Sequence, residues 1–444
     1  MIYLHVPFCR SFCTYCDFYS EIACRGRDAQ LFEQYADAVC AEASRRRDEI
    51  EATRDLNTLY IGGGTPSVLP LSLLRQMAAA IRRTALRADE NYFPDKFAGK
   101  PISAPPSTTP THAYAPYTEF TIEVNPEDIV EKGEAYVRGL LELGVNRVSM
   151  GVQSLDDGIL RWMNRRHDAA HARQAFEILR RAGVKNISVD LIFGLSQLSE
   201  AVLAETLREI IAWHPEHISA YQLSIEAGSA LGRMVREGRY AEAPQEQCAA
   251  QYRLLCETLR DAGYKHYEIS NWALPGREAI HNSAYWSRHP YVGLGPGAHS
   301  FHDRTRSWND CTLTLSNPHR FAEPPMEGAS PSTFVPGGDS VASTFSESLA
   351  DTSSRRLKAP SLRSNSNHAP DCSARSEELS EEEEREEIIM LGLRTAKGIP
   401  AEGLDATKAA EMLADGRLAQ LPDGRLRIPE SYWFVSDDII ADLL

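Results

Sequence analysis

Residues 3–18 have the sequence YLHVPFCRSFCTYCDF, which places three cysteines in a C-x3-C-x2-C pattern. The pattern begins four residues after a predicted strand, Ile2–His5, so Cys9, Cys13 and Cys16 share one compact loop. Three thiolates on such a loop converge on one soft metal site. Zinc usually takes a fourth protein ligand, whereas a 4Fe-4S cluster can leave one iron open to an exchangeable ligand. The pattern therefore favours an iron–sulfur cluster, with zinc and three unrelated buried cysteines as the alternatives.

Short apolar runs alternate with amphipathic helices through the first half of the chain. The helical spacing of Ala172, Phe176 and Leu179 is one example. This alternation predicts an α/β fold with a parallel sheet, either an incomplete (β/α)6 barrel or an open doubly wound sheet, with ligands at the carboxyl ends of the strands. The predicted strands are Ile2–His5, Thr58–Ile61, Glu119–Val124, Arg147–Gly151, Asn186–Leu191 and His217–Leu223.

Composition divides the chain into parts. Residues 93–117 hold six prolines in 25 positions, and residues 323–376 hold 13 serines and six prolines in 54. Such compositions bury too little apolar surface to offset chain entropy, so both segments are predicted to be disordered insertions. We expect residues 1–320 to form the core. Residues 377–444 are expected to form a small C-terminal α+β unit of winged-helix type, because an acidic helix start and a helical segment precede a predicted strand pair.

The 444 residues carry a formal net charge of −15, from 47 lysines and arginines against 62 aspartates and glutamates. Binding to nucleic acid requires a surplus of basic groups, which this chain does not have. No apolar run approaches the roughly 20 residues that cross a bilayer, and the N-terminus has no signal-peptide pattern. We therefore expect a cytoplasmic protein with no nucleic-acid partner and no transmembrane segment.

Glycines and charged residues stand near the predicted strand ends. The glycines in GGGT, residues 62–65, let the backbone approach a ligand closely, although a plain strand-to-helix turn is the alternative. Glu123 can accept hydrogen bonds from an amino group or from hydroxyls, and its alternative is a solvated strand-end acid. Arg165 presents donors that suit a carboxylate. Asp190 lies in an otherwise apolar strand, where a buried carboxylate needs a partner such as a ribose.

Several strings in this order resemble a known family. The cysteine loop resembles that of the radical S-adenosylmethionine (SAM) superfamily. Together with Tyr3 and His5, the strings IGGGTP (61–66), EVNP (123–126) and GVQS (151–154) resemble the branch that contains oxygen-independent coproporphyrinogen III dehydrogenase and the HemW heme chaperones. The resemblance runs from residue 3 to about residue 320, apart from the expected insertions, and resumes near Glu381.

The resemblance implies an incomplete parallel (β/α)6 barrel in which Cys9, Cys13 and Cys16 hold a 4Fe-4S cluster. SAM would bind the fourth iron, and an electron donor would reduce the cluster, which then cleaves SAM to methionine and a 5′-deoxyadenosyl radical. The residues that the resemblance assigns to the SAM site are Tyr3, Gly63, Gly64, Thr65, Glu123, Gln153, Arg165 and Asp190.

Two features separate the relatives within this branch. The dehydrogenase pattern has a further cysteine where this chain has Phe18, whereas the HemW pattern HNxxYW occurs here as HNSAYW, residues 281–286. The resemblance therefore favours a heme chaperone that passes heme to acceptor proteins, expected to be respiratory enzymes, without dehydrogenase activity. The dehydrogenase is the alternative. The expected heme site comprises His281 as axial ligand with Asn282, Tyr285 and Trp286. The alternative is that His281 is a hydrogen-bonded core residue of a structural motif, with His299 or His302 as the ligand.

Overall fold

The computed structural model describes residues 1–23, 28–85, 117–309 and 374–444. Its centre is a nine-stranded sheet. Six neighbouring strands, from β1 to β8 in the order below, pair in parallel, and β11 adds a seventh parallel strand beside β1. The order from edge to edge is β11 (Val292–Leu294), β1 (Ile2–Val6), β4 (Thr58–Gly63), β5 (Glu119–Val124), β6 (Arg147–Gln153), β7 (Ile187–Phe193), β8 (His217–Gln222), β10 (Asn271–Ala273) and β9 (Lys265–Glu268). The predicted α/β class with six parallel strands in an unclosed barrel is confirmed.

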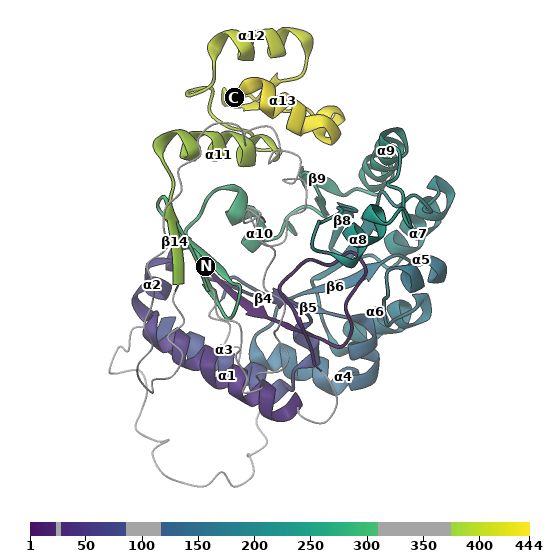
Figure 1. Cartoon of the computed structure of the whole chain (residues 1–444), viewed down its shortest axis with the longest axis vertical. Helices are drawn as coiled ribbons and strands as arrows, with labels where there is room; N and C mark the ends of the chain where they lie inside the picture. Colours follow the sequence, from purple (N-terminus) through teal and green to yellow (C-terminus); the bar gives the residue numbers. More distant parts are fainter. Residues whose placement is uncertain (24–27, 86–116, 310–373) are drawn as a thin grey trace.

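Helices connect successive parallel strands and cover the outer face of the sheet (Figure 1). Helix α1 packs on α3, and α4 packs on α6. Local sequence sets their ends: Asp168 and Ser199 cap the starts of α6 and α7, and Gly144 and Gly183 end α4 and α6 in the left-handed conformation. The helices up to residue 286 are α1 (Asp28–Arg45), α2 (Arg47–Ala52), α3 (Leu71–Ala85), α4 (Pro126–Leu143), α5 (Asp157–Trp162), α6 (Ala169–Ala182), α7 (Glu200–Ala212), α8 (Ala230–Arg236), α9 (Gln245–Asp261) and α10 (Ile280–Trp286).

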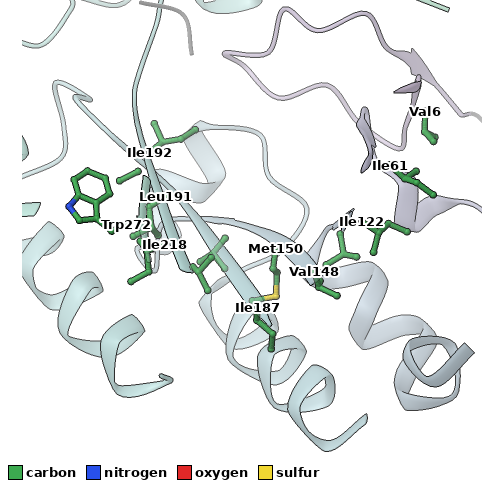
Figure 2. Packing of buried hydrophobic residues seen from close by; sticks show 14 of the residues in the cluster. Val6, Ile61, Ile122, Val148, Met150, Ile187, Leu191, Ile192, Ile218 and Trp272 are labelled. Atoms are coloured by element: carbon green, nitrogen blue, oxygen red, sulfur yellow. The ribbon is translucent and has the colours of Figure 1, made fainter. Parts of the chain in front are cut away.

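The two faces of the sheet differ in chemistry. Side chains alternate along each strand, and Ile122, Val148 and Ile187 belong to the large apolar core beneath the helices (Figure 2). The alternate positions of the same strands are polar and include Glu123 and Asp190, which line a cavity. Parallel strands buried under helices on both faces are usually apolar throughout. The polar alternation therefore marks a barrel interior built to hold a ligand.

Smaller elements complete the fold. The short strands β2 (Phe8–Cys9) and β3 (Glu21–Ile22) pair across the cysteine loop. A three-stranded sheet joins β12 (His299–His302), β13 (Thr305–Asn309) and β14 (Ala374–Glu378). The C-terminal residues form α11 (Glu381–Leu393), α12 (Ala406–Asp415), β15 (Ala419–Gln420), β16 (Leu426–Arg427), the 3-10 helix η4 (Glu430–Val435) and α13 (Ser436–Leu443).

Most of the two segments that were expected to separate the domains lie outside the described residues. Of the two expected insertions, only Tyr117, which is buried, and residues 374–376, which begin β14, lie inside the described ranges. Helix α12 and the β15–β16 pair occupy the positions expected for a C-terminal α+β unit, and its winged-helix character stays a prediction. Within the described ranges, no helix combines the length and apolarity that crossing a membrane requires.

Candidate cofactor-binding site

A cavity of about 580 Å³ lies against the polar face of the sheet and reaches the cysteine loop. Every residue that the sequence assigned to the cluster or to SAM lines this cavity. These residues are Tyr3, Cys9, Cys13, Cys16, Gly63, Gly64, Thr65, Glu123, Gln153, Arg165 and Asp190. They come from five strands and the segments that follow them, so the fold gathers groups that are far apart in sequence.

Two backbone hydrogen bonds hold the segment that leads into the cysteine loop against the turn that follows β4. The amides of Gly64 and Thr65 donate hydrogen bonds to the carbonyl oxygens of Val6 and Phe8, both at 2.7 Å. A Cβ atom on Gly64 would lie 2.8 Å from each of these two oxygens. The absence of a side chain at Gly64 is therefore what allows the two segments to approach so closely.

A chain of polar contacts joins two of the three thiols. The Cys9 Sγ lies 3.5 Å from Thr65 Oγ1, to which the Asn125 side-chain amide donates at 3.2 Å. The Arg165 guanidinium donates to Asn125 Oδ1 at 2.6 Å and to Cys13 Sγ at 3.4 Å. Arg165 therefore connects the cysteine loop to the strand ends through its side chain.

The donor set fits an iron–sulfur cluster chemically. Burial raises the pKa of Cys9, and it raises the pKa of Cys16 to about 12, so these thiols stay protonated unless a cation stabilises the thiolates. Nearby, Arg165 Nε is buried without a hydrogen-bond partner in the structure. A buried, unsatisfied donor at the cavity wall is suited to an anionic group of a ligand.

Glu123 is a half-buried acid of the cavity wall. Its carboxylate accepts hydrogen bonds from Tyr60 Oη at 2.7 Å and from the Gly63 amide at 3.0 Å. Burial is the largest influence on this group and raises its pKa to about 7. A Cβ atom on Gly62 would lie 2.7 Å from Glu123 Oε1, so glycine at 62 leaves room for the carboxylate. An acid held in this way is ready to accept a cationic donor.

Strands β6 and β7 supply the remaining polar wall. Gln153 has a positive φ of 66° at the point where the β6–β7 register shifts, an uncommon conformation that turns its side chain at the strand end. Asp190 accepts hydrogen bonds from Ser149 Oγ at 2.9 Å and from Ser188 Oγ at 3.2 Å. The expected need of Asp190 for a partner is therefore met by hydroxyls of the protein itself.

Arg147 is a cavity residue that sequence reasoning missed. Its side chain is buried and lines the cavity, and its Nε and Nη1 have no hydrogen-bond partner among the described residues. The same signal that singled out Asp190, a charge within an otherwise apolar strand, could have found it. With the half-buried Arg165, it places two guanidinium groups beside the acids of the cavity.

The HNSAYW segment lies in α10, and its members divide between core and cavity. His281 is fully buried, with its Nδ1 2.8 Å from Thr58 Oγ1 and its Nε2 3.0 Å from Tyr285 Oη. Both ring nitrogens therefore have partners within the core, and ligation of iron would require one of these hydrogen bonds to break. Asn282 lines the cavity, whereas Tyr285 is buried beside Met1 and Trp286 is half-buried outside the cavity lining.

The two alternative histidines lie elsewhere. His299 lines the cavity, and its ring stacks on Trp308 with 5.7 Å between the ring centroids. Burial lowers the pKa of His299, which keeps the imidazole neutral and able to bind a metal. His302 is exposed and lies 3.1 Å from Asp303. Of the three histidines considered, only His299 belongs to the cavity wall.

The fold and this cavity define a protein of the radical SAM class. The family model described as the radical SAM superfamily matches residues 3–210. The solved structure of coproporphyrinogen III oxidase (HemN) from Escherichia coli has a TM-score of 0.69 and 17% sequence identity, and covers 100% of this chain and 89% of that one. At this identity the likeness concerns the fold.

Sequence relatives narrow the class further. The protein named heme chaperone HemW from Synechocystis sp. is 34% identical over 308 residues, which are 68% of this chain and 66% of that protein. HemW of Bacillus subtilis is 33% identical over 69% of this chain and 72% of that protein, and HemW of Mycobacterium tuberculosis is 32% identical over 72% and 73%. The chain spans about two thirds to three quarters of these relatives. It belongs to the HemW family of the radical SAM superfamily.

Proposed function

We propose that this protein is a heme chaperone that binds a 4Fe-4S cluster, SAM and heme, and passes heme to acceptor proteins. The observation that carries the proposal is the cavity in which three cysteines, the buried Arg147 and the half-buried Arg165 and Glu123 meet, in a chain 32–34% identical to proteins named HemW. Respiratory enzymes are the proposed acceptors, the cytoplasm is the proposed location, and a reductant of the cluster is a proposed partner.

The residues of the cavity would bind the cluster and SAM in separate roles. Cys9, Cys13 and Cys16 would ligate the cluster, which supplies one-electron chemistry to SAM when both are bound. Glu123 would accept hydrogen bonds from the amino group of SAM, and Arg165, which also contacts Cys13 Sγ, would hold the SAM carboxylate. The remaining assigned SAM residues, Tyr3, Gly63, Gly64, Thr65, Gln153 and Asp190, would shape the wall around it.

Heme would bind at the mouth of the same cavity. Phe12 and Phe18 line the cavity and are 46% and 52% exposed, so they offer an apolar surface to a macrocycle. His299 is the proposed axial ligand. The HNSAYW segment would serve the site through Asn282, while His281 and Tyr285 hold α10 against β4.

Heme titration of the anaerobically reconstituted protein tests this assignment through the Soret band. We expect His299→Ala to weaken heme binding at least tenfold, because an axial ligand bond is lost. The control is His302→Ala, which changes an exposed histidine and should leave the affinity for heme unchanged. The axial ligand would instead lie in the HNSAYW segment if a folded His281→Ala variant loses the Soret shift while the His299→Ala variant binds heme normally.

The chaperone role itself is tested by transfer. Heme-loaded protein mixed with an apo b-type cytochrome should yield holo-cytochrome, and the absorbance of the acceptor measures the yield. In parallel, the reconstituted protein is incubated anaerobically with SAM, a reductant and coproporphyrinogen III. Turnover to protoporphyrinogen without heme transfer would replace the chaperone assignment with the dehydrogenase.

The cluster ligands are tested separately. We expect Cys9→Ala to lose the iron-dependent absorbance at about 400 nm after reconstitution. A SAM-binding cluster needs three cysteine thiolates from the protein, and this variant has two of them. Cys40→Ala is the control, since Cys40 lies on α1 outside the cavity lining. Retention of full iron and sulfide content in Cys9→Ala would contradict the assignment.

A further inference from the structure

A second group of metal-ligating side chains lies away from the cavity, between the barrel edge and the C-terminal residues. It consists of Cys256 on α9, His266 on β9 and Glu430 at the start of η4. One ligand atom from each lies within 4.8 Å of the others. The His266 Nδ1 is 3.0 Å from Glu430 Oε1 and 3.8 Å from Cys256 Sγ. Ligand atoms around one tetrahedral zinc ion lie roughly 3.3–3.8 Å apart, so little movement would be needed.

The imidazole ring of His266 is held in a fixed orientation. It stacks on Trp272 with 3.9 Å between centroids and an interplanar angle of 14°, and it meets Trp433 edge-on at 4.3 Å. Its Nε2 lies 3.2 Å from the carbonyl oxygen of Ile269. A carbonyl oxygen can only accept, so Nε2 carries the hydrogen. A hydrogen bond of this kind from the second ring nitrogen to a backbone carbonyl is the usual support of a metal-bound histidine.

The remaining atoms of the group are all possible metal ligands, Cys256 after its thiol releases a proton. With the hydrogen on Nε2, the Nδ1 lone pair of neutral His266 points toward the Glu430 carboxylate, and Cys256 Sγ adds a third donor. His266 is 3% exposed, so water is largely excluded from the imidazole, while Glu430 is 35% exposed. A metal cation at the centre would be bound by all three ligand atoms. The exposed side next to Glu430 leaves room for a water molecule as a further ligand.

We propose that Cys256, His266 and Glu430 form a zinc site that joins the C-terminal residues to the barrel. One sulfur, one nitrogen and one oxygen ligand with an open fourth position are a donor set that Zn²⁺ accepts. A metal bound there would tie η4 to α9 and β9. This inference does not depend on the proposed heme function.

Metal binding is measured on the full-length chain with Cys9, Cys13 and Cys16 replaced by alanine, so that the cavity cysteines cannot compete. We expect one Co²⁺ per chain, a sulfur-to-cobalt charge-transfer band, and displacement of that band by one equivalent of Zn²⁺. Cys256→Ser should remove the charge-transfer band. Cys248→Ser, which changes another buried cysteine of α9, should retain it.

A second variant guards against a folding defect. Glu430→Gln is isosteric and partly exposed, and we expect it to weaken Co²⁺ binding at least tenfold with an unchanged circular dichroism spectrum. The group is instead a plain His266–Glu430 ion pair if the chain takes up no Co²⁺. The assignment is also overturned if the band survives in Cys256→Ser.

Discussion

Glu123 shows at the residue scale how the barrel interior prepares a group for a ligand. Its only hydrogen-bond donors described in the structure are Tyr60 and the Gly63 amide, which are neutral, and burial raises its pKa to about 7. Hydrogen bonds donated by the amino group of a bound ligand would stabilise the carboxylate and lower that pKa again. Protonation of Glu123 and binding of such a ligand therefore oppose each other.

This opposition predicts a pH dependence of SAM binding. Above about pH 7 the carboxylate is charged and binds the amino group, and as the pH falls through about 7 the protonated acid loses that interaction. We expect the affinity of the reconstituted protein for SAM to fall roughly tenfold between about pH 8 and about pH 6, measured by equilibrium dialysis. Glu123→Gln should bind weakly with a flat profile, whereas Glu131→Gln, an exposed acid outside the cavity lining, should keep the slope. A flat wild-type profile would contradict the role of Glu123.

At the scale of a single element, α11 shows why a dense acidic run is tolerated. Eight glutamates lie between residues 377 and 387, and four of them fill the first turn of α11, where the helix dipole favours negative charge. Ser380 caps the helix, and its side chain and the Glu383 side chain form a reciprocal capping box. Arg288 pairs with Glu384 and Glu387. The prediction that this acid starts an apolar helix is confirmed.

The cap predicts a stability change that is independent of the cavity. We expect Ser380→Ala to lower the free energy of unfolding by about 1 kcal/mol, because the Glu383 amide loses its acceptor. Urea denaturation followed by circular dichroism measures the change, and heme and SAM binding should not change. Ser376→Ala, an exposed serine of β14, serves as the control. Equal stability of both variants would show that the cap contributes nothing measurable.

Over the whole molecule, one apolar cluster runs from the barrel into the C-terminal residues. Leu4 and Ile122 of the barrel and Leu393, Trp433 and Ile440 near the C-terminus belong to it. The carbonyl oxygen of Arg394 accepts a hydrogen bond from the Ile269 amide, which adds a backbone link between the two parts. A shared core of this kind favours unfolding as one cooperative unit.

The shared core predicts a large effect from its central aromatic residue. Trp433 is 2% exposed and donates a hydrogen bond to the Ile428 carbonyl oxygen. We expect Trp433→Ala to lower the free energy of unfolding by roughly 3–5 kcal/mol in a single transition. Chelator-treated protein is used in urea denaturation, so that a bound metal does not contribute. Val435→Ala, at a 39% exposed position, should cost under about 1 kcal/mol. A separate early transition for the C-terminal residues would show that the cores are independent.

The sequence by itself determined the α/β class and the parallel strands, and its family resemblance named the cluster and SAM residues that line the cavity. This was possible because the three cysteines are close together in the sequence, and because parallel strands bring their carboxyl ends to one edge of the sheet. Only the tertiary structure decided which neighbours surround each group. It gave Asp190 two serine partners, placed His281 in the core and His299 at the cavity, and brought Arg147 inside.

The group of Cys256, His266 and Glu430 is the clearest case of what tertiary structure alone supplies. Glu430 is 164 residues from His266, and no local spacing links the three. A motif can be found in sequence when its members lie on one loop or one helix, because chain geometry then fixes their separation. Contacts between distant residues depend instead on how the C-terminal residues pack against α9 and β9, and that packing is set by the buried apolar surface of the whole fold.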